Sequence, residues 1–115
     1  LAICTNKPEA MAIRLMRLLG LADRFQAIAG ADTFAWRKPD PRHLLATIER
    51  AGGDPARAVM IGDTATDIDT AIAAGIPVIA VRFGYSEVPV DSLEPTIAID
   101  HFDALTPAMV SRLIG

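Results

Sequence analysis

Three short segments hold polar residues whose types suit phosphate and metal binding, and each lies beside an apolar run. They are Thr5-Asn6-Lys7, Arg37–Pro41 with Lys38 near its start, and Gly62–Asp67. A hydroxyl beside backbone donors, a lysine and two carboxylates make up most of a magnesium-dependent phosphoryl-transfer site. The nucleophile of such a site is the missing part. We therefore expect these residues to form the C-terminal part of a catalytic domain, without the nucleophile.

The two carboxylates, Asp63 and Asp67, are the metal candidates. Asp63 stands at the end of a predicted strand, where its hard oxygen atoms suit Mg²⁺, an ion that takes one or two carboxylates together with water and substrate phosphate. We assign Asp67 to the same site. An alternative stays open for Asp67, because an aspartate commonly caps a helix and a helix is expected to begin near Ile68.

Two further segments are phosphate candidates. The residue before Pro39 is held extended, and a lysine fixed in this way, Lys38, can neutralise a phosphoryl group as a point charge. The alternative is an ordinary exposed lysine. Thr5 and Asn6 follow the first predicted strand at a helix start, where a hydroxyl and unpaired N–H groups favour phosphate. Either residue could instead only cap that helix, and Lys7 is expected to face solvent.

The remaining candidates are weaker. His43 and His101 lack a second histidine or cysteine at ligand spacing, so neither predicts zinc. We interpret Cys4, within a strand, as a small core residue rather than a nucleophile. Trp36 could pack or line a pocket, and Gly84-Tyr85-Ser86 could form a substrate rim, but their residue types alone are uninformative.

Composition limits the partners. The formal net charge is −3 and no basic cluster exceeds Arg37-Lys38, which argues against nucleic acid. Every apolar run is interrupted well before the ~20 residues of a membrane span, so no membrane partner is expected. The single cysteine excludes an intramolecular disulfide and fits a reducing cytoplasm. The chain starts inside an apolar segment without Met, which suggests a piece of a longer protein, so missing targeting signals carry little weight.

Short apolar runs alternate with longer amphipathic segments along the chain. Strands are predicted at residues 1–4, 26–29, 58–61, 77–81 and 96–99. Helices are predicted from Pro8 to Gly20 with Asn6 as cap, from Pro41 to Gly52, from the Gly62 turn to Gly75, and from Thr106 to Ile114.

This alternation predicts an α/β fold with a mostly parallel sheet. Ligands of such sheets bind beyond the carboxyl ends of the strands. Thr5, Gly62-Asp63 and Arg82-Phe83 each follow a strand directly, so we expect them to converge on one edge. The length of 115 residues fits a single domain over residues 1–115.

The pattern resembles the haloacid dehalogenase-like superfamily of phosphohydrolases, and most of all its phosphoglycolate phosphatase group. Thr5–Pro8 is similar to the second motif of that superfamily, Arg37–Pro41 to the third and Gly62–Asp67 to the fourth. The connecting segments Leu18–Leu21, Ala74–Pro77 and Arg82–Tyr85 also resemble that group. The resemblance covers nearly the whole chain.

The resemblance implies a Rossmann-like three-layer sandwich that lacks its first, central strand and its cap domain. It also implies a magnesium-dependent phosphomonoester hydrolase that works through an aspartyl-phosphate. Thr5 would hold a phosphate oxygen, Lys38 would balance charge, and Asp63 would complete the Mg²⁺ site, which Asp67 would orient. The nucleophilic aspartate and the aspartate that acts as acid and base belong to the missing first motif. We therefore expect these 115 residues alone to be inactive.

Other functions stay open. The chain could be a noncatalytic module that binds phosphate or a partner, or a relative of phosphosugar mutases or pyrophosphatases. A dehalogenase relative would not need magnesium, so the Asp63/Asp67 pair argues against it. The expected substrate is a small phosphorylated metabolite. The missing strand would lie between residues 1–4 and 58–61, and two exposed strand edges lead us to expect self-association of the isolated polypeptide.

Overall fold

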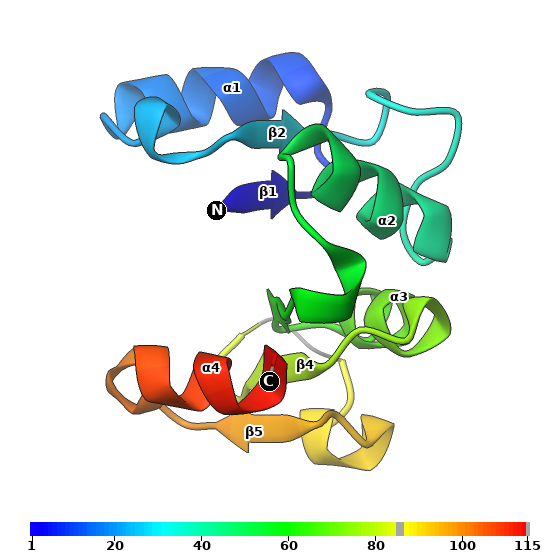
Figure 1. The fold of residues 1–115 in the computed structure, drawn as a ribbon, viewed down its shortest axis with the longest axis vertical. Helices are drawn as coiled ribbons and strands as arrows, with labels where there is room; N and C mark the ends of the chain where they lie inside the picture. The colour runs from blue at the N-terminus through cyan, green and yellow to red at the C-terminus, as the bar shows by residue number, and fades with distance from the viewer. Residues whose placement is uncertain (85–86, 115) are drawn as a thin grey trace. The chain divides into compact units, whose positions relative to one another are not determined.

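A computed structural model describes residues 1–84 and 87–114 of the chain. Tyr85, Ser86 and Gly115 lie outside the described residues, so the substrate rim predicted at Gly84-Tyr85-Ser86 is described only at Gly84. The chain divides into two compact units, Leu1–Pro55 and Ala56–Gly115 (Figure 1).

The unit Leu1–Pro55 is built on two parallel strands. These are β1 (Ala2–Cys4) and β2 (Ala27–Ala29), paired with Ala2 opposite Ala27. Helix α1 (Glu9–Leu18) packs against β2, and helix α2 (Pro41–Arg50) packs against both strands. A short 3₁₀ turn, Ala22–Arg24, leads from α1 into β2.

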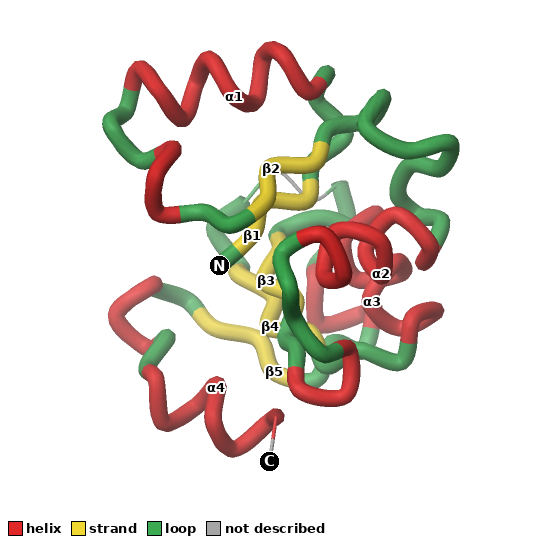
Figure 2. The backbone as a smooth tube through the Cα atoms, turned by 45° about the horizontal axis from the view of Figure 1, so that its top comes forward, coloured by secondary structure: helices red, strands yellow, loops and turns green. Residues whose placement is uncertain are grey.

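The unit Ala56–Gly115 holds a parallel sheet in the order β3-β4-β5 (Figure 2). Its elements are β3 (Met60–Gly62), α3 (Ala65–Ala74), β4 (Val78–Val81), β5 (Ile97–Ile99) and α4 (Pro107–Ile114), with 3₁₀ turns at Val90–Leu93 and Phe102–Ala104. A further 3₁₀ turn, Pro55–Arg57, spans the boundary between the two units. All four residues of β4 are buried, as expected of a central parallel strand.

The core of this second unit is apolar. Ile79 and Val81 alternate onto one face of β4 and form a buried cluster with Ile99. Three α4 side chains, Met109, Val110 and Leu113, pack against this cluster. Helix α3 contacts β3 and β4 and buries Ile68 and Ala71 completely.

All the described strand pairings are parallel, which confirms the Rossmann-like α/β fold class. The described strands form two sheets, of two and three strands, rather than one. Within the described residues, β1 pairs only with β2, and β3 pairs only with β4. The predicted strand between them stays a prediction. No helix in the described part of the chain is long and apolar enough to cross a membrane.

The cap predicted for α1 is wrong. The helix begins at Glu9 with Pro8 as N-cap residue and no side-chain cap bond, so Asn6 does not cap it. Instead, Asp32 comes from a distant loop, and its Oδ1 accepts a 2.7 Å hydrogen bond from the Glu9 backbone nitrogen. Gly30 permits this approach, because a Cβ there would lie 2.3 Å from that same nitrogen.

The α2 start was predicted correctly. Asp40 is its N-cap residue and accepts a 2.9 Å hydrogen bond from the backbone nitrogen of Arg42, with Pro41 in the first turn. Side-chain hydrogen bonds from Arg42 are the main cause that lowers the pKa of Asp40 below its usual value. The lowered pKa favours the ionised form of Asp40, and its negative charge is favourable beside the positive end of the helix dipole.

Cys4 is half-buried and contacts a fully buried histidine. Its Sγ lies 3.1 Å from Nδ1 of His43, and Nε2 of the same ring lies 2.8 Å from the Gly30 carbonyl oxygen. A carbonyl oxygen only accepts, so Nε2 must donate, and in the neutral ring Nδ1 accepts from the Cys4 thiol. The pair ties β1 to α2, which agrees with the interpretation of Cys4 as a packing residue.

Candidate phosphate and metal site

Thr5 stands at the carboxyl end of β1. Its backbone nitrogen donates a 3.0 Å hydrogen bond to the Ala29 carbonyl oxygen, which continues the pairing of β1 with β2. Its hydroxyl oxygen accepts a 3.2 Å hydrogen bond from the backbone nitrogen of Lys7. A hydroxyl that accepts through oxygen keeps a proton to donate, so Thr5 offers a donor at the strand end.

Lys38 is buried, with 7% of its surface exposed, so the alternative of an ordinary exposed lysine is wrong. Its backbone nitrogen donates to Asn6 Oδ1 at 3.1 Å, and Asn6 Nδ2 donates to its carbonyl oxygen at 3.0 Å. The peptide bond from Lys38 to Pro39 is cis. The structure thus brings together Asn6 and Lys38, two predicted site residues that are 32 positions apart.

Asp63 and Asp67 come together where β3 turns into α3. Asp67 Oδ2 accepts hydrogen bonds of 3.1 Å from the Asp63 backbone nitrogen and 3.1 Å from the Thr64 hydroxyl. Helix α3 begins at Ala65, and Thr64 is its N-cap residue, so the alternative that Asp67 caps a helix beginning near Ile68 is wrong in position. Asp67 instead lies in the first helical turn, where a negative charge is favourable.

Two glycines make room for these carboxylates. A Cβ on Gly62 would lie 2.6 Å from Asp67 Oδ2, and a Cβ on Gly84 would lie 2.3 Å from Asp63 Oδ2. Neither position can carry a side chain without moving a carboxylate. Sequence reasoning missed the part that Gly84 plays, although a glycine soon after a strand is a recognisable signal of close backbone approach.

The donor set fits Mg²⁺ as a group of two carboxylates. Magnesium is usually held by one or two carboxylates together with water and substrate phosphate, and cages made of protein side chains alone are not required. The described residues contain no cluster of three or more His, Cys, Asp or Glu side chains, which a structural zinc site would use. Asp63 and Asp67 each lie against a glycine, and their assignment to a Mg²⁺ site stays a prediction.

The candidate residues divide between the two units. Thr5, Asn6 and Lys38 belong to Leu1–Pro55, and Asp63 and Asp67 belong to Ala56–Gly115. Hydrogen bonds join Asn6 to Lys38 in the first unit and Asp63 to Asp67 in the second, and Thr5 bonds instead to Ala29 and Lys7. The prediction that both groups meet at one sheet edge stays a prediction.

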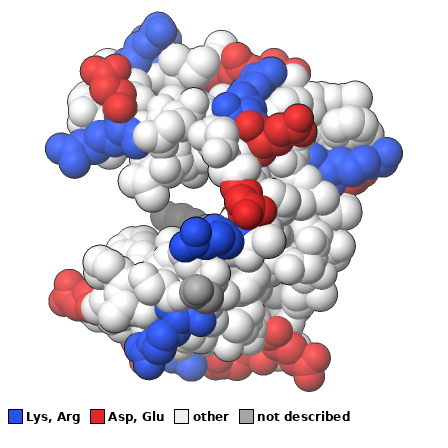
Figure 3. Space-filling view, viewed as in Figure 1, with Lys and Arg blue, Asp and Glu red and all other residues white. Residues whose placement is uncertain are grey.

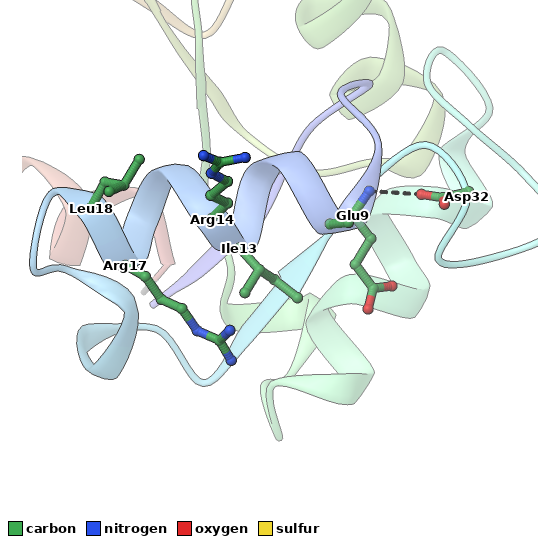
Figure 4. Close-up of a pocket in the computed structure, with 7 residues that line it drawn as sticks. Glu9, Ile13, Arg14, Arg17, Leu18 and Asp32 are labelled. Atoms are coloured by element: carbon green, nitrogen blue, oxygen red, sulfur yellow. Dashed lines mark hydrogen bonds between the residues drawn. The ribbon is translucent and has the colours of Figure 1, made fainter.

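One described pocket lies along α1, and none of the candidate residues lines it. It has a volume of about 760 Å³ and is lined by α1 side chains and Asp32. Figure 4 shows Arg14, Arg17 and Leu18 projecting from the helix. A second pocket, of about 450 Å³, is lined in part by Trp36, whose ring lies 4.8 Å from the Arg42 guanidinium carbon. Charges of both signs are interspersed on the face drawn in Figure 3.

Comparisons with known proteins agree on one family. Residues 1–81 match the family described as haloacid dehalogenase-like hydrolase. A phosphoglycolate phosphatase of Mesorhizobium japonicum is 62% identical over 114 residues, which are 99% of this chain and 50% of that protein. A phosphoglycolate phosphatase of Agrobacterium fabrum is 54% identical over 115 residues, which are 100% of this chain and 49% of that protein.

A solved structure gives the same result. It is described as a predicted phosphoglycolate phosphatase from Haemophilus somnus, and it superposes with a TM-score of 0.85 at 26% identity over 91% of this chain and 47% of that one. The chain spans about half the length of the curated relatives it matches. The family match runs through every candidate residue from Thr5 to Asp67, and the chain belongs to the haloacid dehalogenase-like hydrolase family.

Proposed function

We propose that residues 1–115 are the C-terminal portion of the core domain of a magnesium-dependent phosphomonoester hydrolase similar to phosphoglycolate phosphatases. The observation that carries the proposal is the 62% identity with such a protein over 114 residues, a span that includes all three polar segments. The proposed substrate is a small phosphorylated metabolite, and the proposed location is the cytoplasm.

Thr5 and Lys38 are proposed to bind the phosphoryl group. The Thr5 hydroxyl would donate to one phosphate oxygen, and the Lys38 ammonium would balance the negative charge. Burial supports this role for Lys38, because a charge acts more strongly where water is excluded. The fixed main chain of Lys38 reduces the reorganisation required during reaction.

Asp63 and Asp67 are proposed to hold Mg²⁺. When bound, the ion supplies electrostatic stabilisation to the phosphate oxygens. The two donors to Asp67 Oδ2 orient its carboxylate, so the side chain loses less conformational freedom when a cation binds. In the proposed reaction, an aspartate outside these residues attacks the phosphorus atom, and the ester bond breaks with release of the alcohol. Water then hydrolyses the aspartyl-phosphate to inorganic phosphate.

A chimaeric protein tests the proposal. Residues 1–115 replace the matching half of the Mesorhizobium japonicum relative, and release of inorganic phosphate from phosphoglycolate is measured with and without Mg²⁺. We expect turnover that depends on Mg²⁺, and none from residues 1–115 alone. A folded chimaera that only binds phosphate would contradict the proposal and favour a binding module. Isomerisation of a phosphosugar without phosphate release would favour a mutase.

A further inference from the structure

The amide of Asn6 is used on both sides by one residue. Its Oδ1 accepts a 3.1 Å hydrogen bond from the Lys38 backbone nitrogen, and its Nδ2 donates a 3.0 Å hydrogen bond to the Lys38 carbonyl oxygen. A backbone N–H only donates and a carbonyl only accepts, so the amide can face Lys38 in one orientation. The Asn6 side-chain amide thus makes the same two hydrogen bonds to Lys38 that the main chain of a neighbouring strand residue would make.

Lys38 needs such support because of its neighbours. The next residue is Pro39, which has no N–H with which to anchor the loop. A turn bond of 2.9 Å from the Asp40 backbone nitrogen to the Arg37 carbonyl oxygen closes the segment around it. Both polar groups of the Lys38 main chain are bound by Asn6, so this side chain fixes where the lysine leaves the backbone.

We propose that Asn6 is a positioning residue that acts on phosphate through Lys38, a role that rests on the proposed phosphatase function. Its carbonyl oxygen and one amide hydrogen are committed to the Lys38 backbone. Only the second hydrogen of Nδ2 remains as a donor for any other partner. We call the two hydrogen bonds between the Asn6 amide and the Lys38 main chain the Asn6 clamp. Loss of this clamp moves the ammonium of Lys38 away from the phosphoryl group, and a misplacement of about 1 Å can lower turnover by ~100-fold.

Asn6→Leu is the matched variant, because it keeps a neutral side chain of similar size but removes both hydrogen bonds to the Lys38 main chain. In the active chimaera we expect kcat to fall by about 10- to 100-fold, with KM changed much less. In a Lys38→Ala background the same substitution should change kcat by less than about two-fold, because two residues that act as one unit are not additive. Equal, additive losses in both backgrounds would show direct phosphate binding by Asn6 and overturn the inference.

Asp32→Ala is the control for general loosening of the same unit. Asp32 holds the start of α1 and belongs to no proposed catalytic contact, so this variant should lower the melting temperature and leave kcat unchanged. If Asp32→Ala lowers kcat as much as Asn6→Leu does, Asn6 has only a structural role and the inference is wrong.

Amide hydrogen exchange tests the clamp even if the chimaera is inactive. Asn6→Ala should accelerate exchange at the Lys38 N–H by at least about ten-fold while exchange at the Glu9 N–H stays unchanged, since Asp32 protects that group separately. An inactive chimaera with this exchange pattern would contradict the proposed function but support the hydrogen bonds between Asn6 and Lys38. Unchanged exchange at the Lys38 N–H would show that Asn6 does not protect this group and would contradict the inference.

Discussion

Lys38 is the residue whose loss should affect the proposed reaction most directly. It is buried and its main chain is held by Asn6, so water cannot easily take the place of its ammonium group if the side chain is removed. Lys38→Ala should reduce turnover of the chimaera by roughly 10²–10³, the scale for loss of one preorganised charge-stabilising donor. Steady-state phosphate release measures this. The matched control is Lys7→Ala, because Lys7 is exposed, and an equal loss in both variants would contradict the role of Lys38.

Asp63 allows a separate test of the metal proposal. Asp63→Asn keeps the size of the side chain but removes the negative charge, so the Mg²⁺ concentration for half-maximal activity should rise by at least about ten-fold. A magnesium titration of the chimaera measures the change. Asp69→Asn is the control, because Asp69 is an exposed carboxylate in the same helix. Equal magnesium curves for Asp63→Asn and the parent would leave Asp63 as a structural residue.

At the scale of elements, the turn from β3 into α3 depends on Thr64. Its hydroxyl oxygen accepts from the Asp67 backbone nitrogen at 3.3 Å and the hydroxyl donates to Asp67 Oδ2. Thr64→Ala should lower the free energy of unfolding by about 1 kcal/mol, the usual cost of losing a helix N-cap. Denaturant unfolding of the chimaera measures this. Thr64→Ser keeps the hydroxyl and should retain most of the stability, and equal losses in the two variants would exclude capping as the cause.

Local sequence patterns predicted the elements better than their connections. The start of α2 and the end of α3 were readable because Pro41 and Gly75 act on their own helices. The α1 start was predicted at Pro8 and lies at Glu9, but its side-chain acceptor was not predicted, because Asp32 lies 23 positions away. The same limit applies to the site. Residue types indicated Lys38 and Asp63, but the Asn6 clamp and the Gly84 contact arise only when distant segments pack together.

At the scale of the whole molecule, four strands (β1, β2, β3 and β5) have an edge without a described strand neighbour, and β1 and β3 are the two that the predicted missing strand would pair with. Within the described residues, β1 pairs only with β2 and β3 pairs only with β4. Exposed apolar residues lie in or beside these strands, since Leu1, next to β1, is 83% exposed and Ile61 of β3 is 42% exposed. An open, apolar edge is a template for pairing with another chain. A strand from elsewhere in a longer protein would cover both edges in the proposed phosphatase core.

We therefore expect the isolated 115-residue polypeptide to self-associate or aggregate. Direct closure of β1 on β3 would disturb the helices that pack against their neighbouring strands, so pairing between separate chains is the less costly remedy. Size-exclusion chromatography with light scattering measures the mass, and the chimaera, with the missing half restored, is the control. A monodisperse monomer of residues 1–115 that melts cooperatively would show that the edges are satisfied within the chain, and the proposed position of the missing strand would then be wrong.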